Sequence, residues 1–136
     1  MANSDTALRR LVVAIAAGNI AECTKLLADD PALAKARFEV TNATRQSAKE
    51  NFIAELGKYI YRGDTALHFA ATAHNDEMVR KLIAGGADVH AKNRLGDEPL
   101  HAAATGDPNA NRWNPSSQAT TITALVEAGA DPNAVN

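Results

Sequence analysis

Apolar residues recur along the chain at intervals of three and four residues, the spacing that places side chains on one face of a helix. Near the N-terminus, this pattern predicts a helix that begins at Ser4 or Asp5 and ends at Gly18. Its apolar face consists of Leu8, Leu11, Val12 and Ile15. Asn19 can cap a second helix, because Glu22 follows it at capping-box spacing. The apolar face of that helix carries Cys23, Leu26 and Leu27. The segment is therefore predicted to form a helical hairpin.

A second helical hairpin is predicted farther along the chain. Asp64 or Thr65 can cap its first helix through a side-chain oxygen. The apolar face of this helix consists of Leu67, Ala70 and Ala71. The pattern breaks at His74, and Asn75 can cap the next helix, whose apolar face carries Met78, Val79, Leu82 and Ile83. Gly85 and Gly86 are expected to end it, because glycine readily adopts the left-handed conformation that follows many helices.

The same pattern returns after 33 residues. The segment GDTALHFAA at 63–71 aligns with GDEPLHAAA at 96–104, and Gly-Ala-Asp occurs at 86–88 and again at 129–131. Pro99 stands where the first helical residue is expected, a position that tolerates a missing N–H group. Glu98 stands where the earlier segment has Thr65, so we expect a weaker cap there or one that moves to Asp97. These matches predict a tandem repeat.

The 33-residue period and the Thr-Pro-Leu-His-like starts resemble the ankyrin repeat. The resemblance implies an all-α fold, an ankyrin-type α-solenoid of stacked helix-turn-helix repeats in one domain over residues 1–136. Repeat one covers about 4–34, repeat two about 61–93 and repeat three about 94–136. Repeat one lacks both the Thr-Pro-Leu-His start and the Gly-Ala-Asp end, and we interpret it as an N-terminal cap whose outer face meets water.

A first insertion of about 23 residues separates repeats one and two, over about 38–60. We expect a helix from Ser47 to Tyr61, with Phe52, Ile53, Leu56, Tyr59 and Ile60 on one face. An apolar stripe of this kind must pack on the chain's own repeats, on a second copy or on a partner. We favour its own repeats, because a large exposed apolar stripe is a liability. The inserted helix is then expected to border or partly cover the binding groove.

A second insertion of about ten residues lies inside repeat three. Its composition around 108–117 is typical of a loop, with prolines at 108 and 115 and three asparagines between them. The single tryptophan, Trp113, lies in this loop. Its indole either packs back on the repeats and anchors the loop, or serves as a binding anchor, a role in which tryptophan is enriched.

Composition and charge narrow the classes of partner. The 136 residues carry 14 basic and 16 acidic side chains, a net charge of −2. This balance gives no general attraction to phosphate backbones, so no nucleic-acid partner is expected. No apolar run reaches the length of a membrane-spanning helix, so no membrane association is expected. Arg9 and Arg10 before an apolar run faintly resemble a secretory signal, but the run is short and also fits the predicted hairpin. A single cysteine, Cys23, favours a reducing, cytoplasmic location.

Reactive side chains are present without a catalytic arrangement. His68 and His101 occupy the Leu-His position, where the resemblance implies hydrogen bonds that tie neighbouring repeats together. His74 and His90 are expected at the surface, and Cys23 is expected to be buried and inert. Asp64 and Asp97 lie one period apart, which suggests a row of solvated carboxylates along the stack. We therefore expect no enzyme activity, no metal site and no cofactor.

The resemblance implies a protein-interaction module that binds a partner through a concave groove. The positions matching the family's contact surface are Tyr61, Arg62, Asp64, Thr72 and Ala73 in repeat two, and Arg94, Leu95, Asp97 and Thr105 in repeat three. Trp113 is added as a possible anchor. Two alternatives stay open: an inhibitor or immunity-type protein that blocks a target, and a ligand-binding protein or enzyme that uses the insertions as a pocket.

The C-terminal end of the stack carries one more expectation. Repeat three keeps the features of an internal repeat up to Ala134, with no polar cap after it. Its outer face is therefore expected to be apolar and to be covered by further repeats or by self-association.

Overall fold

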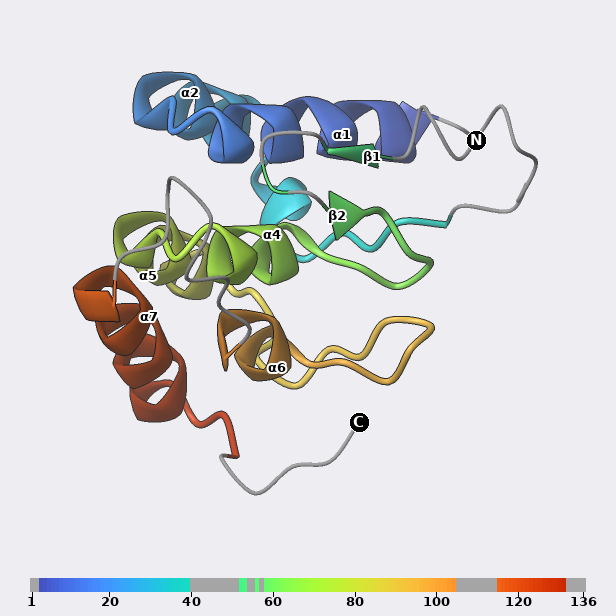
Figure 1. The fold of residues 1–136 in the computed structure, drawn as a ribbon. Coiled ribbons are helices and arrows are strands. Elements are labelled where there is room, and N and C mark those ends of the chain that lie inside the picture. Colours follow the sequence, from blue (N-terminus) through green and yellow to red (C-terminus); the bar gives the residue numbers. More distant parts are fainter. Residues whose placement is uncertain (1–2, 40–51, 54–55, 57, 105–114, 132–136) are drawn as a thin grey trace.

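The computed structural model describes residues 3–39, 52–53, 56, 58–104 and 115–131. Helices pair in three layers: α1 (Asn3–Ala16) with α2 (Ile20–Asp29), α4 (Ala66–Thr72) with α5 (Asp76–Ala84), and α6 (Pro99–Ala104) with α7 (Pro115–Glu127). A short 3-10 helix, η1 (Pro31–Ala34), follows α2. Helix α4 contacts α1 on one side and α6 on the other, so the layers stack in chain order (Figure 1). The predicted all-α stack of helical hairpins is confirmed.

The predicted caps hold at most helix starts. The hydroxyl of Thr65 accepts the N–H of His68 at 3.4 Å, and the Nδ1 of His68 accepts the N–H of Thr65 at 3.1 Å. Asn75 and Asn19 cap α5 and α2, each through its side-chain oxygen. Helix α5 ends before Gly86, whose φ of 100° is left-handed, as the glycine pair predicts. Each hairpin is thus bounded by its own local sequence.

Helix α1 begins earlier than predicted, and α6 begins where it was predicted. Helix α1 already includes Asn3, so Ser4 and Asp5 lie inside its first turn and the predicted cap at these residues is wrong. Pro99 is the first residue of α6, as expected. The Glu98 side chain is buried, and its Oε1 makes no hydrogen bond, in keeping with the weaker cap expected where threonine is replaced.

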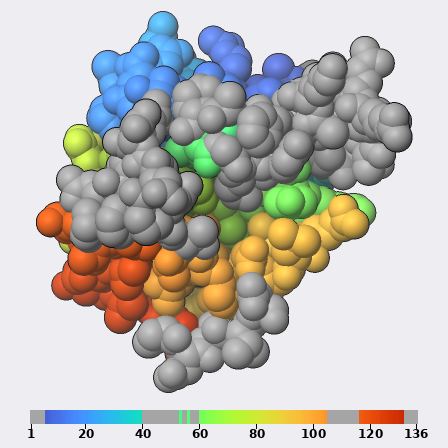
Figure 2. Space-filling view, in the orientation of Figure 1, coloured from blue at the N-terminus to red at the C-terminus, as the bar shows by residue number. Residues whose placement is uncertain are grey.

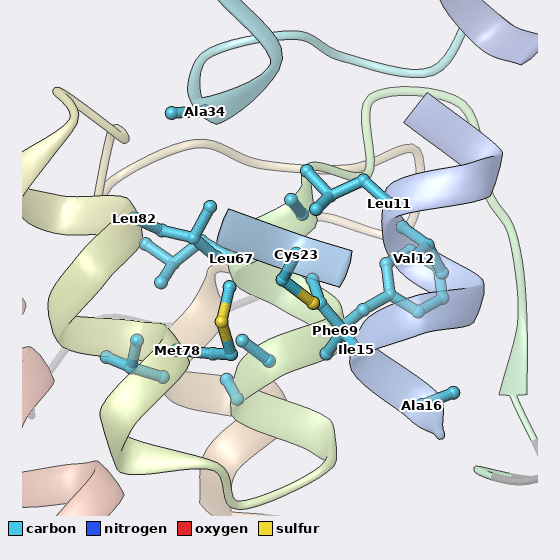
Figure 3. Packing of buried hydrophobic residues seen from close by; sticks show 14 of the residues in the cluster. Leu11, Val12, Ile15, Ala16, Cys23, Ala34, Leu67, Phe69, Met78 and Leu82 are labelled. Atoms are coloured by element: carbon cyan, nitrogen blue, oxygen red, sulfur yellow. The ribbon is translucent and has the colours of Figure 1, made fainter. Parts of the chain in front are cut away.

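The core is centred on α4. Five of its apolar side chains are fully buried: Ala66, Leu67, Phe69, Ala70 and Ala71. Alanine at three of these positions lets the neighbouring helices approach closely. Figure 3 shows Leu11 and Ile15 of α1 in one cluster with Leu67 and with Met78 of α5. Because α4 is covered on both sides, the middle repeat is the interior of the molecule.

The first insertion does not form the predicted helix in its described part. Strands β1 (Phe52–Ile53) and β2 (Lys58–Tyr59) pair antiparallel, so the expected helix is wrong over these residues. Phenylalanine, isoleucine and tyrosine favour strands, and a glycine at position 57 disfavours a helix. The insertion was expected to pack on the chain's own repeats. Its residues Ile53 and Ile60 do so, because both are buried in the core cluster.

The second insertion lies largely outside the described residues, and so does Trp113. The predicted C-terminal boundary of this insertion is wrong. Helix α7 begins at Pro115, so residues 115–117, predicted as loop, are helical. Proline fits the first turn of a helix, where its missing N–H has no partner to lose. No helix within the described ranges has the length and apolar character needed to cross a bilayer.

Candidate partner-binding surface at two neighbouring fingers

Two extended loops project from the same side of the helical stack (Figure 1). We call residues 37–39 and 61–65 the first finger, and residues 91–98 the second finger. In the first finger, the N–H of Phe38 donates to the Asp64 carbonyl, and the N–H of Gly63 donates to the Phe38 carbonyl, both at 2.9 Å. The ring of Phe38 packs edge-on against Phe69 of α4, with 6.1 Å between ring centroids. The finger is therefore anchored in the core.

Asp64 holds the first finger together and does not face a partner. Its side chain is fully buried. One carboxylate oxygen accepts the N–H of Tyr61 at 2.8 Å, and the other accepts the amide of Asn93 at 2.8 Å. The prediction of Asp64 as a partner-binding residue, and as part of a solvated row with Asp97, is therefore wrong. A buried carboxylate needs such donors, because burial without them is costly.

Asn93 organises the second finger. Its side-chain oxygen accepts the N–H groups of Leu95 and Asp97 at 2.9 and 3.1 Å, while its amide reaches Asp64. The N–H of Gly96 closes the turn by donating to the Asn93 carbonyl at 2.9 Å. The sequence reasoning missed this residue. An asparagine followed within three residues by glycine is a common turn signal, and it could have found Asn93.

The two fingers are joined along their backbones. The N–H of Arg94 donates to the Arg62 carbonyl at 2.7 Å. Gly63 has a φ of 87°, and a side chain added to it would place its Cβ 2.9 Å from the Lys92 carbonyl oxygen. Only glycine satisfies both the left-handed conformation and this close approach. The spacing between the finger tips is therefore fixed by the main chain.

Two histidines, His68 and His74, tie repeats two and three together. The Nε2 of buried His68 lies 2.8 Å from the Asp97 carbonyl, so the predicted inter-repeat bond is confirmed for this residue. His101 bonds within its own turn, with its Nδ1 accepting the N–H of Glu98 at 2.9 Å. His90 is exposed, as expected. His74 is partly exposed, and its Nε2 lies 3.0 Å from the Ala103 carbonyl, so it also links repeat two to repeat three.

The remaining predicted contact residues differ in exposure. Arg62 and Arg94 are exposed, and Leu95 is 52% exposed. Tyr61 and Asp97 are partly exposed. Thr72 and Ala73, at the end of α4, are half-buried, and Thr105 and Trp113 lie outside the described residues. In Figure 2, the first and second fingers adjoin at one edge of the molecule.

Cys23 is buried against the core, as expected. Burial raises the pKa of its thiol above the ordinary value of 9.0, and the neighbouring Glu22 carboxylate adds to this. A thiol kept protonated is a poor nucleophile. Over the residues that the structure describes, no three His, Cys, Asp or Glu side chains gather as they would around a metal ion.

Comparison with known proteins agrees with this architecture. The chain is 44% identical to the human mitochondrial disaggregase over 70 residues, which are 52% of this chain and 8% of that protein. It is 36% identical to human protein phosphatase 1 regulatory subunit 27 over 75 residues, 54% of this chain and 42% of that protein. It is 48% identical to human transient receptor potential cation channel subfamily V member 5 over 42 residues, 31% of this chain and 6% of that protein.

These matches cover less than half the length of each relative. The family described as ankyrin repeats, in three copies, matches residues 3–136. The three stacked helical hairpins of the structure agree in number with the three copies. The chain belongs to the ankyrin-repeat family.

Proposed function

We propose that the chain is a non-enzymatic interaction module that binds a partner protein through its two fingers. Ankyrin repeats are generally protein–protein interaction modules. The observation that carries the proposal is the contrast between a fixed finger backbone and the exposed side chains on it. Asp64 and Asn93 are buried and hold the loops, whereas Arg62, Arg94 and Leu95 point to solvent.

A surface of this kind suits recognition. Arginine offers several hydrogen-bond donors in a planar group, and rigid loops lose little conformational entropy on binding. Tyr61 and Asp97 flank the tips and are partly exposed. Thr72, Ala73, Thr105 and Trp113 remain proposed contributors, and no cofactor is invoked. We place this role in the cytoplasm, since the single cysteine of the sequence is buried and favours a reducing compartment.

A narrower role is inhibition or regulation of a target protein. It is favoured by one observation, the similarity to a relative named as a regulatory subunit of protein phosphatase 1. In this case the partner would be an enzyme and the chain would control it. Assaying the partner's activity with and without the chain separates regulation from simple binding.

The proposal is tested by affinity capture with matched variants. Wild-type chain is compared with Arg62→Ala/Leu95→Ala at the tips and with Lys25→Ala/Val126→Ala on α2 and α7, whose side chains are also exposed. We expect a stoichiometric partner that the wild type and the helix variant retain and the tip variant loses. Binding that survives the tip substitutions, or is lost equally in both variants, contradicts the proposal.

A further inference from the structure

The finger tips carry positive charge at adjacent positions. Arg62 lies in the first finger, Lys92 and Arg94 lie in the second, and all three are exposed. The hydrogen bond between the main chains of Arg94 and Arg62 places two arginines side by side. Gly63, which has no Cβ, permits this close approach of the two main chains, and the hydrogen bond then holds the pair together.

The two tip arginines make no ion pair with a described residue, unlike Arg37 and Arg80, which are also exposed. Arg37 lies 3.6 Å from Asp88, and Arg80 lies 3.8 Å from Glu127. Four acids belong to the same fingers, and one of them, Glu98, is buried. Asp64 is committed to the N–H of Tyr61 and the amide of Asn93, and Glu39 and Asp97 form no ion pair with either arginine. The guanidinium groups at the tips are therefore open to carboxylates from outside.

An apolar side chain stands beside this charge. Leu95 is 52% exposed, compared with 44% for Val13 and 39% for Val126, the other exposed large apolar residues of the described chain. Its backbone N–H is held by the Asn93 side chain at 2.9 Å, so the residue has a fixed place next to Arg94. An exposed leucine on a rigid turn is suited to contact an apolar group of a partner.

We propose that the finger tips bind an acidic segment of a partner protein, with its carboxylates on Arg62 and Arg94 and an apolar side chain against Leu95. The inference rests on the proposed function and adds the chemistry of the partner. Arginine pairs with carboxylates through two parallel hydrogen bonds, which gives direction as well as attraction. A nucleic acid fits less well, because the chain is net negative and the helices on the far side of the stack expose acids such as Asp29, Glu77 and Glu127.

The test selects random displayed peptides on the wild-type chain. We expect the selected peptides to be enriched in aspartate and glutamate around an apolar residue. Their affinity is then measured for Arg62→Glu/Arg94→Glu and for Lys25→Glu/Lys81→Glu, a matched reversal of two exposed charges on α2 and α5. The tip variant is expected to lose about tenfold or more in affinity, and the helix variant to keep it. Circular dichroism checks that both variants fold.

A second arm uses peptides in which each acidic residue is replaced by lysine. These are expected to bind the charge-reversed tips better than the wild-type tips. If the selected peptides lack acidic residues and still lose affinity for the tip variant, the inference is overturned, whereas the proposed function is retained. Binding of a single-stranded oligonucleotide that depends on the same arginines would also overturn it. A captured partner whose binding is unchanged by every tip substitution would overturn both this inference and the proposed function.

Discussion

At the scale of single residues, conformation and contact together decide what each position tolerates. Gly63 and Gly18 both have left-handed φ values, 87° and 72°. They differ in their surroundings, because a Cβ on Gly63 would meet backbone of the second finger and one on Gly18 would meet nothing within 4 Å. The pair therefore separates the cost of conformation from the cost of crowding.

We expect Gly18→Ala to lower the free energy of unfolding by about 1 kcal/mol, the cost of a left-handed alanine. Gly63→Ala should cost about 1–3 kcal/mol more, because the Lys92 carbonyl must move. Urea denaturation of both variants measures the difference. Equal losses would show that the fingers shift freely and that their spacing is not fixed.

His74 is the one described non-glycine residue with a left-handed φ, 53°. Its ring lies 3.0 Å from the Ala103 carbonyl, so an unfavourable conformation accompanies a useful contact. We expect His74→Ala to cost about 1 kcal/mol through the lost hydrogen bond. His74→Gly loses the same hydrogen bond, but glycine adopts the left-handed conformation at about 1 kcal/mol less cost. Its free energy of unfolding should therefore be close to that of the wild type. Alanine and glycine variants of equal stability would contradict this account.

At the scale of elements, the fingers are coupled through Asp64 and Asn93. We expect Asp64→Ala to cost about 3 kcal/mol, since it leaves the Tyr61 N–H and the Asn93 amide without their acceptor. In a double-mutant cycle with Asn93→Ala, the interaction energy should be about 0.5–3 kcal/mol. Purely additive losses would show that the two fingers are held independently. The cycle is measured by denaturant unfolding.

The helical elements follow from sequence, and the loops follow only in part. Spacing of apolar residues and capping residues such as Asn75 act locally, so α2, α4 and α5 could be predicted with their main boundaries. The strands at Phe52–Ile53 and Lys58–Tyr59 could not, because the same apolar spacing suits a helix and burial in the core decides between them. The burial of Asp64 could not be predicted for a related reason. Its burial depends on Asn93, 29 residues away, and no local pattern shows that contact.

At the scale of the whole molecule, α4 makes the three repeats depend on one another. Its side chains are covered by α1 and α6, and α5 contacts α7. Repeats of this kind gain stability from their neighbours rather than alone. An exposed change at a finger tip touches none of these interfaces, whereas we expect a core change in one repeat to weaken the other repeats as well.

We therefore expect Ile15→Ala in α1 to speed hydrogen exchange in α6 as well as in α1. The substitution should cost about 2–5 kcal/mol, as truncation of a fully buried isoleucine usually does. Mass spectrometry of exchanged peptides reads each repeat separately, and Val13→Ala, at a 44% exposed position on the same helix, serves as control. Faster exchange confined to the first repeat would show that the repeats unfold one by one.

The finger backbone takes its shape from buried groups, the Asp64 carboxylate, the Asn93 side chain and the main chain at Gly63, while the side chains at Arg62, Arg94 and Leu95 contribute nothing to that shape. These three positions can thus be exchanged for other amino acids without disturbing the scaffold. Randomising them would turn the chain into a compact library of binders, and lineages that drift at these sites would acquire new targets while keeping an unchanged interior.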